Sequence, residues 1–263
     1  MDERPIGVFD SGVGGISVLA ALRKQLPGER FIYYGDTLHA PYGTKTPDEV
    51  MHCVRSVTDC LLSRGIKALV IACNTASAVA AAELRHVYSE LPIVAMEPAL
   101  KPAHELRRAG SIAVLATPMT LRLPKFAALM RLYGEGAIPI PCPGLMELIE
   151  REDFPAAAAF VQEKLSSLDI GRLDAVVLGC THYVFLRPWL RPALPGHVSL
   201  LDGNIGTARQ TENILRRRDM LSGRAAGSYV LETSGDGTVV LPQMERLLRL
   251  AADLYGGLPE VPA

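Results

Sequence analysis

The sequence lacks any long apolar run. Although 49% of its 263 residues are hydrophobic, no stretch approaches the roughly 18 to 20 residues that a membrane-spanning helix needs. No charged-then-apolar leader precedes the first apolar segment, so we expect a cytoplasmic protein. The net charge is only −1, and the one basic run is Arg216-Arg217-Arg218. Without a basic field, neither nucleic acid nor a membrane is expected as a partner.

Cysteine is scarce, and the spacing of the cysteines matches no common metal-binding pattern. The five cysteines match neither a CxxC nor a zinc-type Cys/His pattern; they are Cys53, Cys60, Cys73, Cys142 and Cys180. We therefore expect reduced thiols and no bound metal. Cys53 and Cys60 stand seven residues apart in a helical stretch, which predicts that both lie on one face in the core.

What is present is a regular alternation of short apolar strands with helix-length segments, typical of parallel βαβ units. Four strands are predicted in a first set, at residues 6–9, 30–34, 68–72 and 93–96. A second set is predicted at 111–115, 137–140, 175–178 and 198–201. Helical patterns fill the gaps, for example at 16–25, 75–87, 155–166 and 207–218, and 229–233 is predicted to add an edge strand.

The two sets of strands correspond in order, which indicates a divergent duplication. The segments that match just past the strand ends are Phe9-Asp10-Ser11-Gly12 with Leu115-Ala116-Thr117-Pro118, Gly35-Asp36-Thr37 with Pro141-Cys142-Pro143, Ala72-Cys73-Asn74-Thr75 with Gly179-Cys180-Thr181-His182, and Glu97-Pro98 with Asp202-Gly203. Ligands bind at that edge of open parallel sheets.

We therefore predict an α/β protein of two pseudo-symmetric parallel-sheet domains, with the active site in the cleft between them. The first domain is predicted to comprise residues 1–97 plus 208–263, and the second residues 98–207. The chain is expected to cross between the halves within residues 98–105. The tail 256–263 is expected to fray.

Two cysteines carry the most information. Cys73 and Cys180 each follow an apolar strand and precede polar residues. Asn74 and Thr75 are good helix caps, so Cys73 is predicted to lie at a helix start, where the N–H groups and the dipole lower a thiol pKa. A helix start is also expected after Cys180. Two thiols presented in this way suggest one acting as base and the other as acid.

The loop Asp10-Ser11-Gly12-Val13-Gly14-Gly15 leads into a helix and suits a bound carboxylate. It fits neither GxGxxG nor the phosphate-loop pattern. Asp10 is the natural partner for a substrate ammonium, with a simple Asx turn as the alternative. Pro41-Tyr42-Gly43 is predicted to be a turn with an exposed aromatic that covers a small ligand, Asp36 to be structural, and His39 to be solvated.

These motifs resemble the glutamate racemases, the cofactor-independent, two-cysteine type of the aspartate/glutamate racemase superfamily. The resemblance runs from about residue 6 to residue 218 and rests on four ordered motifs: Phe9-Asp10-Ser11-Gly12-Val13-Gly14-Gly15; Gly35-Asp36-Thr37 with Pro41-Tyr42-Gly43; Cys73-Asn74-Thr75-Ala76-Ser77; and Gly179-Cys180-Thr181-His182-Tyr183. It implies interconversion of L-glutamate and D-glutamate for peptidoglycan synthesis and cell-wall biogenesis, no cofactor, and a homodimer.

The resemblance also implies roles for individual residues. Cys73 and Cys180 would be the acid–base thiols, assisted by Asp10 and His182, with Glu150 as a possible helper. Substrate contacts would come from Asp10, Ser11, Tyr42, Gly43, Asn74, Thr75, Thr117, Thr120, Thr181 and His182. The second half departs from the usual pattern at Met119, Leu123, Phe126, Val184 and Gly203, which bears on affinity.

Three alternatives are open from the sequence. A racemase of another acidic amino acid, chiefly aspartate, would differ in cleft length. A non-catalytic amino-acid-binding protein would bind its ligand without exchanging the α-proton. A redox dithiol pair would require the two sulfurs to approach to about 2.05 Å, whereas a substrate must fit between catalytic thiols.

Overall fold

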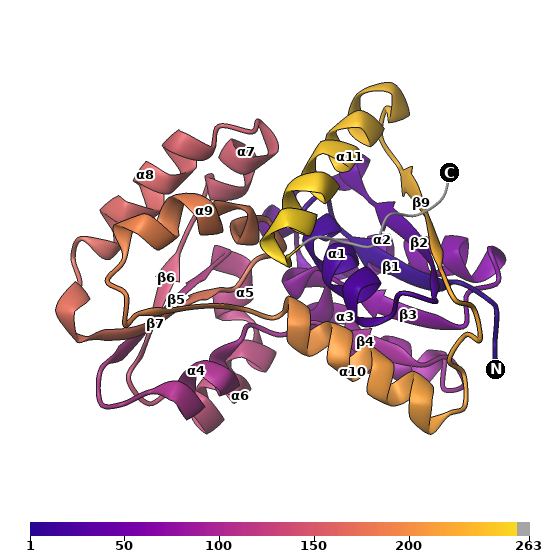
Figure 1. Cartoon of the computed structure of the whole chain (residues 1–263), viewed down its shortest axis with the longest axis horizontal. Helices are drawn as coiled ribbons and strands as arrows, with labels where there is room; N and C mark the ends of the chain where they lie inside the picture. The colour runs from indigo at the N-terminus through magenta and orange to yellow at the C-terminus, as the bar shows by residue number, and fades with distance from the viewer. Residues whose placement is uncertain (257–263) are drawn as a thin grey trace. The chain divides into compact units, whose positions relative to one another are not determined.

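A computed structural model of the chain describes residues 1–256 (Figure 1). The predicted tail therefore falls almost wholly outside the described residues. The chain forms two compact units: the first contains Met1–Met96 and returns at Asn204, and the second is Glu97–Gly203. Each is an α/β unit built on a parallel sheet.

The first unit has a five-stranded sheet in the order β4-β3-β1-β2-β9. Its strands are β1 (Ile6–Asp10), β2 (Arg30–Gly35), β3 (Ala68–Ile71), β4 (Ile93–Ala95) and β9 (Ser228–Thr233). All of the pairings are parallel, and β1 and β3 are buried throughout. Near-continuous apolar strands of this kind belong inside a sheet covered on both faces.

Helices of the first unit pack in two groups around that sheet (Figure 1). Helix α1 packs against α10 and α11, whereas α2 packs against α3. The helical segments are α1 (Ile16–Gln25), η1 (Thr37–His39), η2 (Tyr42–Thr44), α2 (Pro47–Ser63), α3 (Asn74–Val87), α10 (Asn204–Arg217) and α11 (Gly237–Leu254), where η marks a 3₁₀ helix.

The second unit has a four-stranded parallel sheet in the order β6-β5-β7-β8. Its strands are β5 (Ser111–Ala116), β6 (Ala137–Pro141), β7 (Leu173–Leu178) and β8 (Ser199–Asp202). The helical segments are α4 (Leu100–Leu106), α5 (Pro118–Arg122), α6 (Pro124–Tyr133), α7 (Leu145–Glu150), α8 (Phe154–Leu165), η3 (Ile170–Arg172), η4 (Thr181–Leu186), α9 (Arg187–Leu190) and η5 (Arg191–Ala193).

The two sheets share one topology, as a duplication requires. Replacing β1, β2, β3 and β4 by β5, β6, β7 and β8 converts the order β4-β3-β1-β2 into β8-β7-β5-β6, which is the order of the second sheet. The prediction of two parallel-sheet α/β units is confirmed, every predicted strand is present, and β9 occupies the predicted edge.

The prediction that the chain crosses between the two halves within residues 98–105 is wrong. Most of it is helix α4, which belongs to the second unit and packs against β5, β7 and β8. Leu100 and Ala103 are fully buried in a core cluster that also contains Phe126. A helix of seven residues with one apolar stripe has a weak sequence signature, so its packing is visible only in the folded unit.

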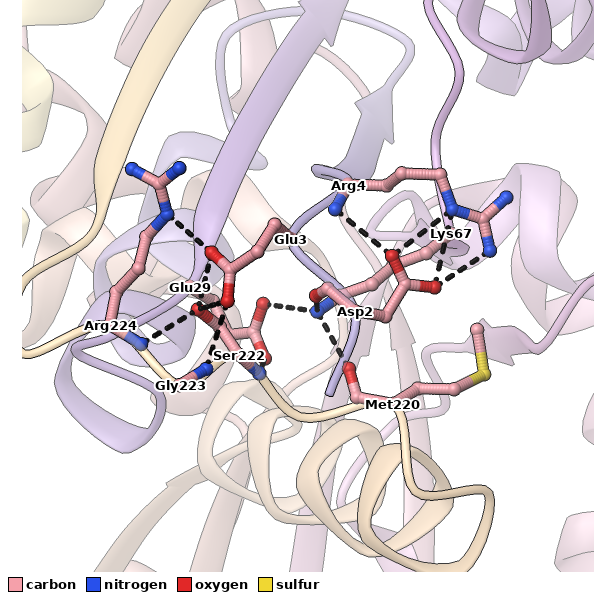
Figure 2. Close-up of polar contacts among 9 residues, drawn as sticks. All are labelled: Asp2, Glu3, Arg4, Glu29, Lys67, Met220, Ser222, Gly223 and Arg224. Carbon is pink, nitrogen blue, oxygen red and sulfur yellow. Dashed lines mark hydrogen bonds and ion pairs between the residues drawn. The ribbon is translucent and has the colours of Figure 1, made fainter.

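A buried ion pair in the first unit ties the N-terminal segment and the segment after α10 to the sheet (Figure 2). The Lys67 ammonium lies 2.6 Å from Glu29, and both side chains are almost completely buried. Lys67 also donates to the backbone carbonyls of Asp2 and Met220, at 2.6 and 2.7 Å. Glu29 accepts the backbone N–H of Ser222 at 2.8 Å. These bonds join the segment before β1 to the segment that follows α10.

Among the described residues, no helix combines the length and the apolar character needed to cross a membrane.

Candidate active site: two half-sites at matching strand ends

Both cysteines follow the strand beside the first strand of their sheet. In the first unit the Ala72 N–H donates to the Phe9 carbonyl at 2.7 Å. In the second, the Gly179 N–H donates to the Leu115 carbonyl, also at 2.7 Å. The next residue is Cys73 in one case and Cys180 in the other. In the order β4-β3-β1-β2, β2 is added on one side of β1 and β3 on the other, and ligands of open α/β sheets bind where the strand order switches sides in this way.

The residue before Cys180 is a glycine because the chain passes too close to β5 for a side chain. A Cβ on Gly179 would lie 2.7 Å from the Leu115 carbonyl oxygen, closer than real Cβ contacts allow. The same holds for Gly15, where a Cβ would lie 2.5 Å from the Cβ of Asp10. Glycine at these positions lets the chain pass close to β5 and to Asp10.

Cys73 is itself the cap of helix α3. Its sulfur accepts the backbone N–H of Ala76 at 3.4 Å, so the predicted caps Asn74 and Thr75 are the first residues of the helix. The Ser11 hydroxyl lies 3.4 Å from the same sulfur. A hydrogen bond from a helix N-terminus favours the charged form of a thiol. The predicted location of Cys73 at a helix start is confirmed, and the sulfur contacts the helix directly.

Two polar side chains beside Cys73 are oriented by their own turns. Asp10 is buried, and its Oδ1 accepts the Gly12 N–H at 2.8 Å, which is the Asx turn considered as the alternative. The turn orients the Asp10 carboxylate at the end of β1. Asn74 is also buried; its Nδ2 lies 3.3 Å from the Met96 sulfur, and its Oδ1 has no hydrogen-bond partner among the residues described. A buried acceptor of this kind is costly unless a ligand satisfies it.

The prediction that Tyr42 is an exposed aromatic is wrong. Tyr42 is buried, its ring packs against Phe9 with centroids 6.3 Å apart, and its hydroxyl donates to Asp36 Oδ2 at 2.6 Å. Burial, and then the hydrogen bond to the Asp36 carboxylate, raises the pKa of Tyr42 far above its usual value. A phenol can fill the pocket beside Phe9 once Asp36 satisfies its hydroxyl. Gly43 follows it in η2 and is half-buried.

Cys180 has a different environment. The sequence predicts a helix start after Cys180, and the segment that follows is the 3₁₀ helix η4 rather than an α-helix. No side-chain cap bond is made at its start. Instead, His182 Nδ1 lies 3.7 Å from the Cys180 sulfur, and His182 Nε2 lies 2.9 Å from Glu150 Oε1. Glu150 ends α7, whose residues pack against η4. The structure thus joins three predicted residues in one chain of contacts.

The protonation of His182 follows from these contacts. Burial by itself lowers the pKa of His182, but the hydrogen bonds to Cys180 and Glu150 outweigh it and raise the pKa well above its ordinary value. An imidazolium donates from both nitrogens and so satisfies a thiolate and a carboxylate together. His182 thus presents a charged N–H donor to the Cys180 sulfur.

The position that matches Asp36 in the second unit holds Cys142. The Asp36 N–H donates to the Asp10 carbonyl and the Cys142 N–H to the Ala116 carbonyl, each at 3.0 Å. Burial, and then the neighbouring Cys180, raises the pKa of Cys142 to about 12. Cys142 therefore stays a neutral thiol next to the second half-site. The sequence correspondence indicated its position but no role for it.

The remaining predicted residues of the second unit lie around the ends of β5 and β7. Thr117 caps α5, because its hydroxyl oxygen accepts the Thr120 N–H at 3.2 Å, and its own hydroxyl donates to Thr120 Oγ1 at 2.9 Å. Thr181 is buried at the start of η4. In the first unit, Thr75 is buried in the first turn of α3.

The departures from the family pattern fall on packing positions. Phe126 belongs to the core cluster of the second unit, and Met119 and Val184 are buried. Leu123 is the residue before α6 and makes no side-chain cap bond. Gly203 follows β8 and is half-buried.

One further cluster could ligate a metal. Among the described residues, Asp36, His39 and Cys53 offer a carboxylate oxygen, an imidazole nitrogen and a sulfur within 4.8 Å of one another. The cluster lies in the first unit, and Asp36 connects it to Tyr42. The predicted core positions of Cys53 and Cys60 are wrong: both are half-buried and line a cavity.

Comparison with known proteins agrees with this geometry. Residues 6–211 match the Asp/Glu/Hydantoin racemase family, and the chain belongs to that family. It is 47% identical over 226 residues to a glutamate racemase of Clostridium botulinum, covering 84% of this chain and 88% of that protein.

Solved structures are similar over nearly the whole chain. A glutamate racemase isoform of Bacillus anthracis superposes with a TM-score of 0.85 at 30% identity, covering 95% of each chain. A glutamate racemase of Francisella tularensis, solved in complex with D-glutamate, gives a TM-score of 0.81 at 26% identity, with 95% of each chain covered.

Proposed function

We propose that this chain is a glutamate racemase that interconverts L-glutamate and D-glutamate by two-thiol proton transfer without an added cofactor. The observation that carries the proposal is the pair of cysteines at topologically equivalent strand ends, Cys73 after β3 and Cys180 after β7. Membership of a racemase family and the names of the related proteins support it. Glutamate is the expected substrate because the related proteins are glutamate racemases.

The path of the protons in the reaction explains why two thiols are needed. One sulfur, as a thiolate, takes the α-proton from one face of the substrate and becomes a thiol. The other, as a thiol, gives its proton to the opposite face of the α-carbon and becomes a thiolate. Each turnover therefore exchanges the states of Cys73 and Cys180. An unperturbed thiol pKa of about 8.5 is close enough to neutrality for both roles.

The difficult step is the removal of a weakly acidic α-proton, and the first half-site offers groups that stabilise the charge. The N–H groups at the start of α3 would act on the enediolate that develops at the substrate carboxylate. Asp10 would hold the substrate ammonium, whose positive charge offsets the carbanion. The unpartnered Oδ1 of Asn74 would accept a hydrogen bond from the same ammonium.

The second half-site would use His182 in place of a helix. As an imidazolium, His182 would donate a hydrogen bond to the Cys180 sulfur, and Glu150 would keep the imidazole charged and oriented. His182 is thus a proposed catalytic residue, whereas Glu150 is a positioning residue that acts through it. The further substrate contacts proposed are Ser11, Tyr42, Gly43, Thr75, Thr117, Thr120 and Thr181.

The cellular role follows from this activity. The D-glutamate product would supply peptidoglycan precursor synthesis and so cell-wall biogenesis, in the cytoplasm. We also propose a homodimer. Light scattering of the purified chain would give twice its 28.4 kDa mass, and a mass of 28.4 kDa at assay concentration would contradict it.

The activity is tested by proton NMR with L-glutamate in D₂O, without added cofactor, followed by chiral analysis of the amino acid. We expect the α-proton signal to disappear as D-glutamate accumulates. L-Aspartate is the matched control, since it differs from glutamate by one methylene. Exchange of aspartate with no exchange of glutamate would assign another acidic amino acid, and ligand binding without any exchange would contradict a racemase.

A further inference from the structure

Helix α2 and the short helix η1 enclose a cavity that the racemase chemistry does not use. The cavity has a volume of about 210 Å³ and lies within the first unit. Cys53, Val57 and Cys60 line it from one face of α2, because residues three, four and seven positions apart share a face of a helix. Asp36 and His39 line it from the start and the end of η1.

The polar lining includes three kinds of group that zinc binds in proteins. Asp36, His39 and Cys53 present oxygen, nitrogen and sulfur within 4.8 Å of one another, and His52 lines the same cavity. Thiolate, imidazole and carboxylate together are the ligand set of zinc, whereas magnesium and calcium take oxygen ligands alone. We propose that Asp36, His39 and Cys53 form a Zn²⁺ site in this cavity.

The distances require only small side-chain movements. A tetrahedral zinc ion with ligands at about 2.0 to 2.3 Å places its ligand atoms roughly 3.4 to 3.6 Å apart. His39 Nδ1 now lies 2.8 Å from Asp36 Oδ1, so the ion would replace the hydrogen atom between them and push them slightly apart. The His39 side chain is 50% exposed, so a small movement of its ring would meet solvent rather than packed side chains. A water molecule or His52 would complete the coordination.

The site is compatible with the neighbouring half-site. Asp36 Oδ2 accepts the Tyr42 hydroxyl at 2.6 Å, whereas Oδ1 faces His39. Zinc bound through Oδ1 leaves the Tyr42 hydrogen bond in place. The buried carboxylate of Asp36 and the thiolate of Cys53 together balance the charge of the ion, as a partly buried cation requires.

The proposal is tested in a Cys73→Ser/Cys180→Ser background, which removes the two thiols assigned to racemisation. Cobalt(II) is titrated as a spectroscopic substitute for zinc, and zinc then competes for the same site. We expect one ion per chain, a near-ultraviolet band from thiolate-to-cobalt charge transfer, and a zinc-dependent rise in melting temperature. No band and no zinc-dependent stabilisation would overturn the proposal.

Variants in the same background assign the ligands. Cys53→Ser should abolish the charge-transfer band, and His39→Ala should weaken zinc binding by more than about tenfold. His39 is half-exposed, so its variant keeps the test valid if Cys53→Ser fails to fold. Cys60→Ser, on the same helix face and outside the triad, is the matched control and should keep both the band and the affinity. A band that survives Cys53→Ser, or one lost only in Cys60→Ser, would contradict the assignment.

Discussion

The two units have the same sheet topology and hold a cysteine at the same strand end, yet they surround that cysteine differently. Cys73 caps the 14-residue helix α3 and lies beside the Ser11 hydroxyl. Cys180 precedes a 3₁₀ helix and lies beside His182, which contacts Glu150. The Cys73 sulfur contacts the N-terminus of a helix, whereas the Cys180 sulfur contacts a histidine side chain. The duplication preserved the position of the thiol, while the groups around it diverged.

The largest effect is expected from removing either thiol. Cys73→Ser and Cys180→Ser should each lower the racemisation rate by about 10² to 10⁴-fold, because a serine hydroxyl is too weak an acid to exchange protons near neutrality. Chiral analysis of the product measures this loss in both directions. Cys60→Ser, which removes a half-buried thiol away from the strand ends, should remain fully active. Similar losses in all three variants would contradict a special role for the strand-end thiols.

A smaller effect should separate the two half-sites. His182→Asn removes the charged partner of Cys180, which corresponds to about 1.5–3 kcal/mol for a hydrogen bond to a charged group. We expect kcat/KM to fall by about 10 to 150-fold, and steady-state kinetics from each enantiomer measure it. Glu150→Gln should cause a smaller loss, because the imidazole is still present. An equal or larger loss in Glu150→Gln would mean that Glu150 itself contacts the substrate.

The smallest kinetic effect is expected on the Cys73 side. Ser11→Ala removes one hydroxyl next to the sulfur, worth about 1 kcal/mol, and leaves the cap bond from Ala76 in place. The same steady-state assay should show a loss of about fivefold. A loss as large as that of His182→Asn would show that the helix alone does not sustain the Cys73 thiolate.

The raised pKa of His182 makes the second unit sensitive to pH. The pKa is about 6.5 in the unfolded chain and higher in the folded protein, so the folded state holds more protons between the two values. The stabilisation from His182 is therefore complete below pH 6.5 and is lost as pH rises through the folded pKa. NMR titration of the imidazole in Glu150→Gln should give a lower pKa than in the wild type. An unchanged pKa would exclude Glu150 as its support.

The sequence predicts the framework because the framework is encoded locally. Apolar runs such as those of β1 and β3 predict buried strands, and Asn74 and Thr75 predict the start of α3 within one residue. Because strands alternate with helices along the chain, the sequence also predicts parallel strands, whose carboxyl ends lie at one edge of the sheet. The sequence alone therefore predicts that Cys73 and Cys180 lie at strand ends.

Contacts between distant residues could not be predicted in the same way. Glu150 lies 32 residues from His182, and only a family resemblance suggested it as a helper. Lys67 carries a charge that usually stays in water, and its burial depends on Glu29 and on the carbonyls of Asp2 and Met220. Cys53 meets His39 because a loop packs against a helix. Such contacts depend on tertiary packing, which leaves no periodic pattern in the sequence.

The central claim is that Cys73 and Cys180 serve opposite faces of one substrate. The most direct test follows α-proton exchange in D₂O by NMR, starting separately from L-glutamate and from D-glutamate, in the Cys73→Ser and Cys180→Ser variants. Each variant is predicted to exchange one enantiomer only, and the two variants are predicted to select opposite enantiomers. Exchange of both enantiomers by either variant, or selection of the same enantiomer by both, would contradict the two-thiol account.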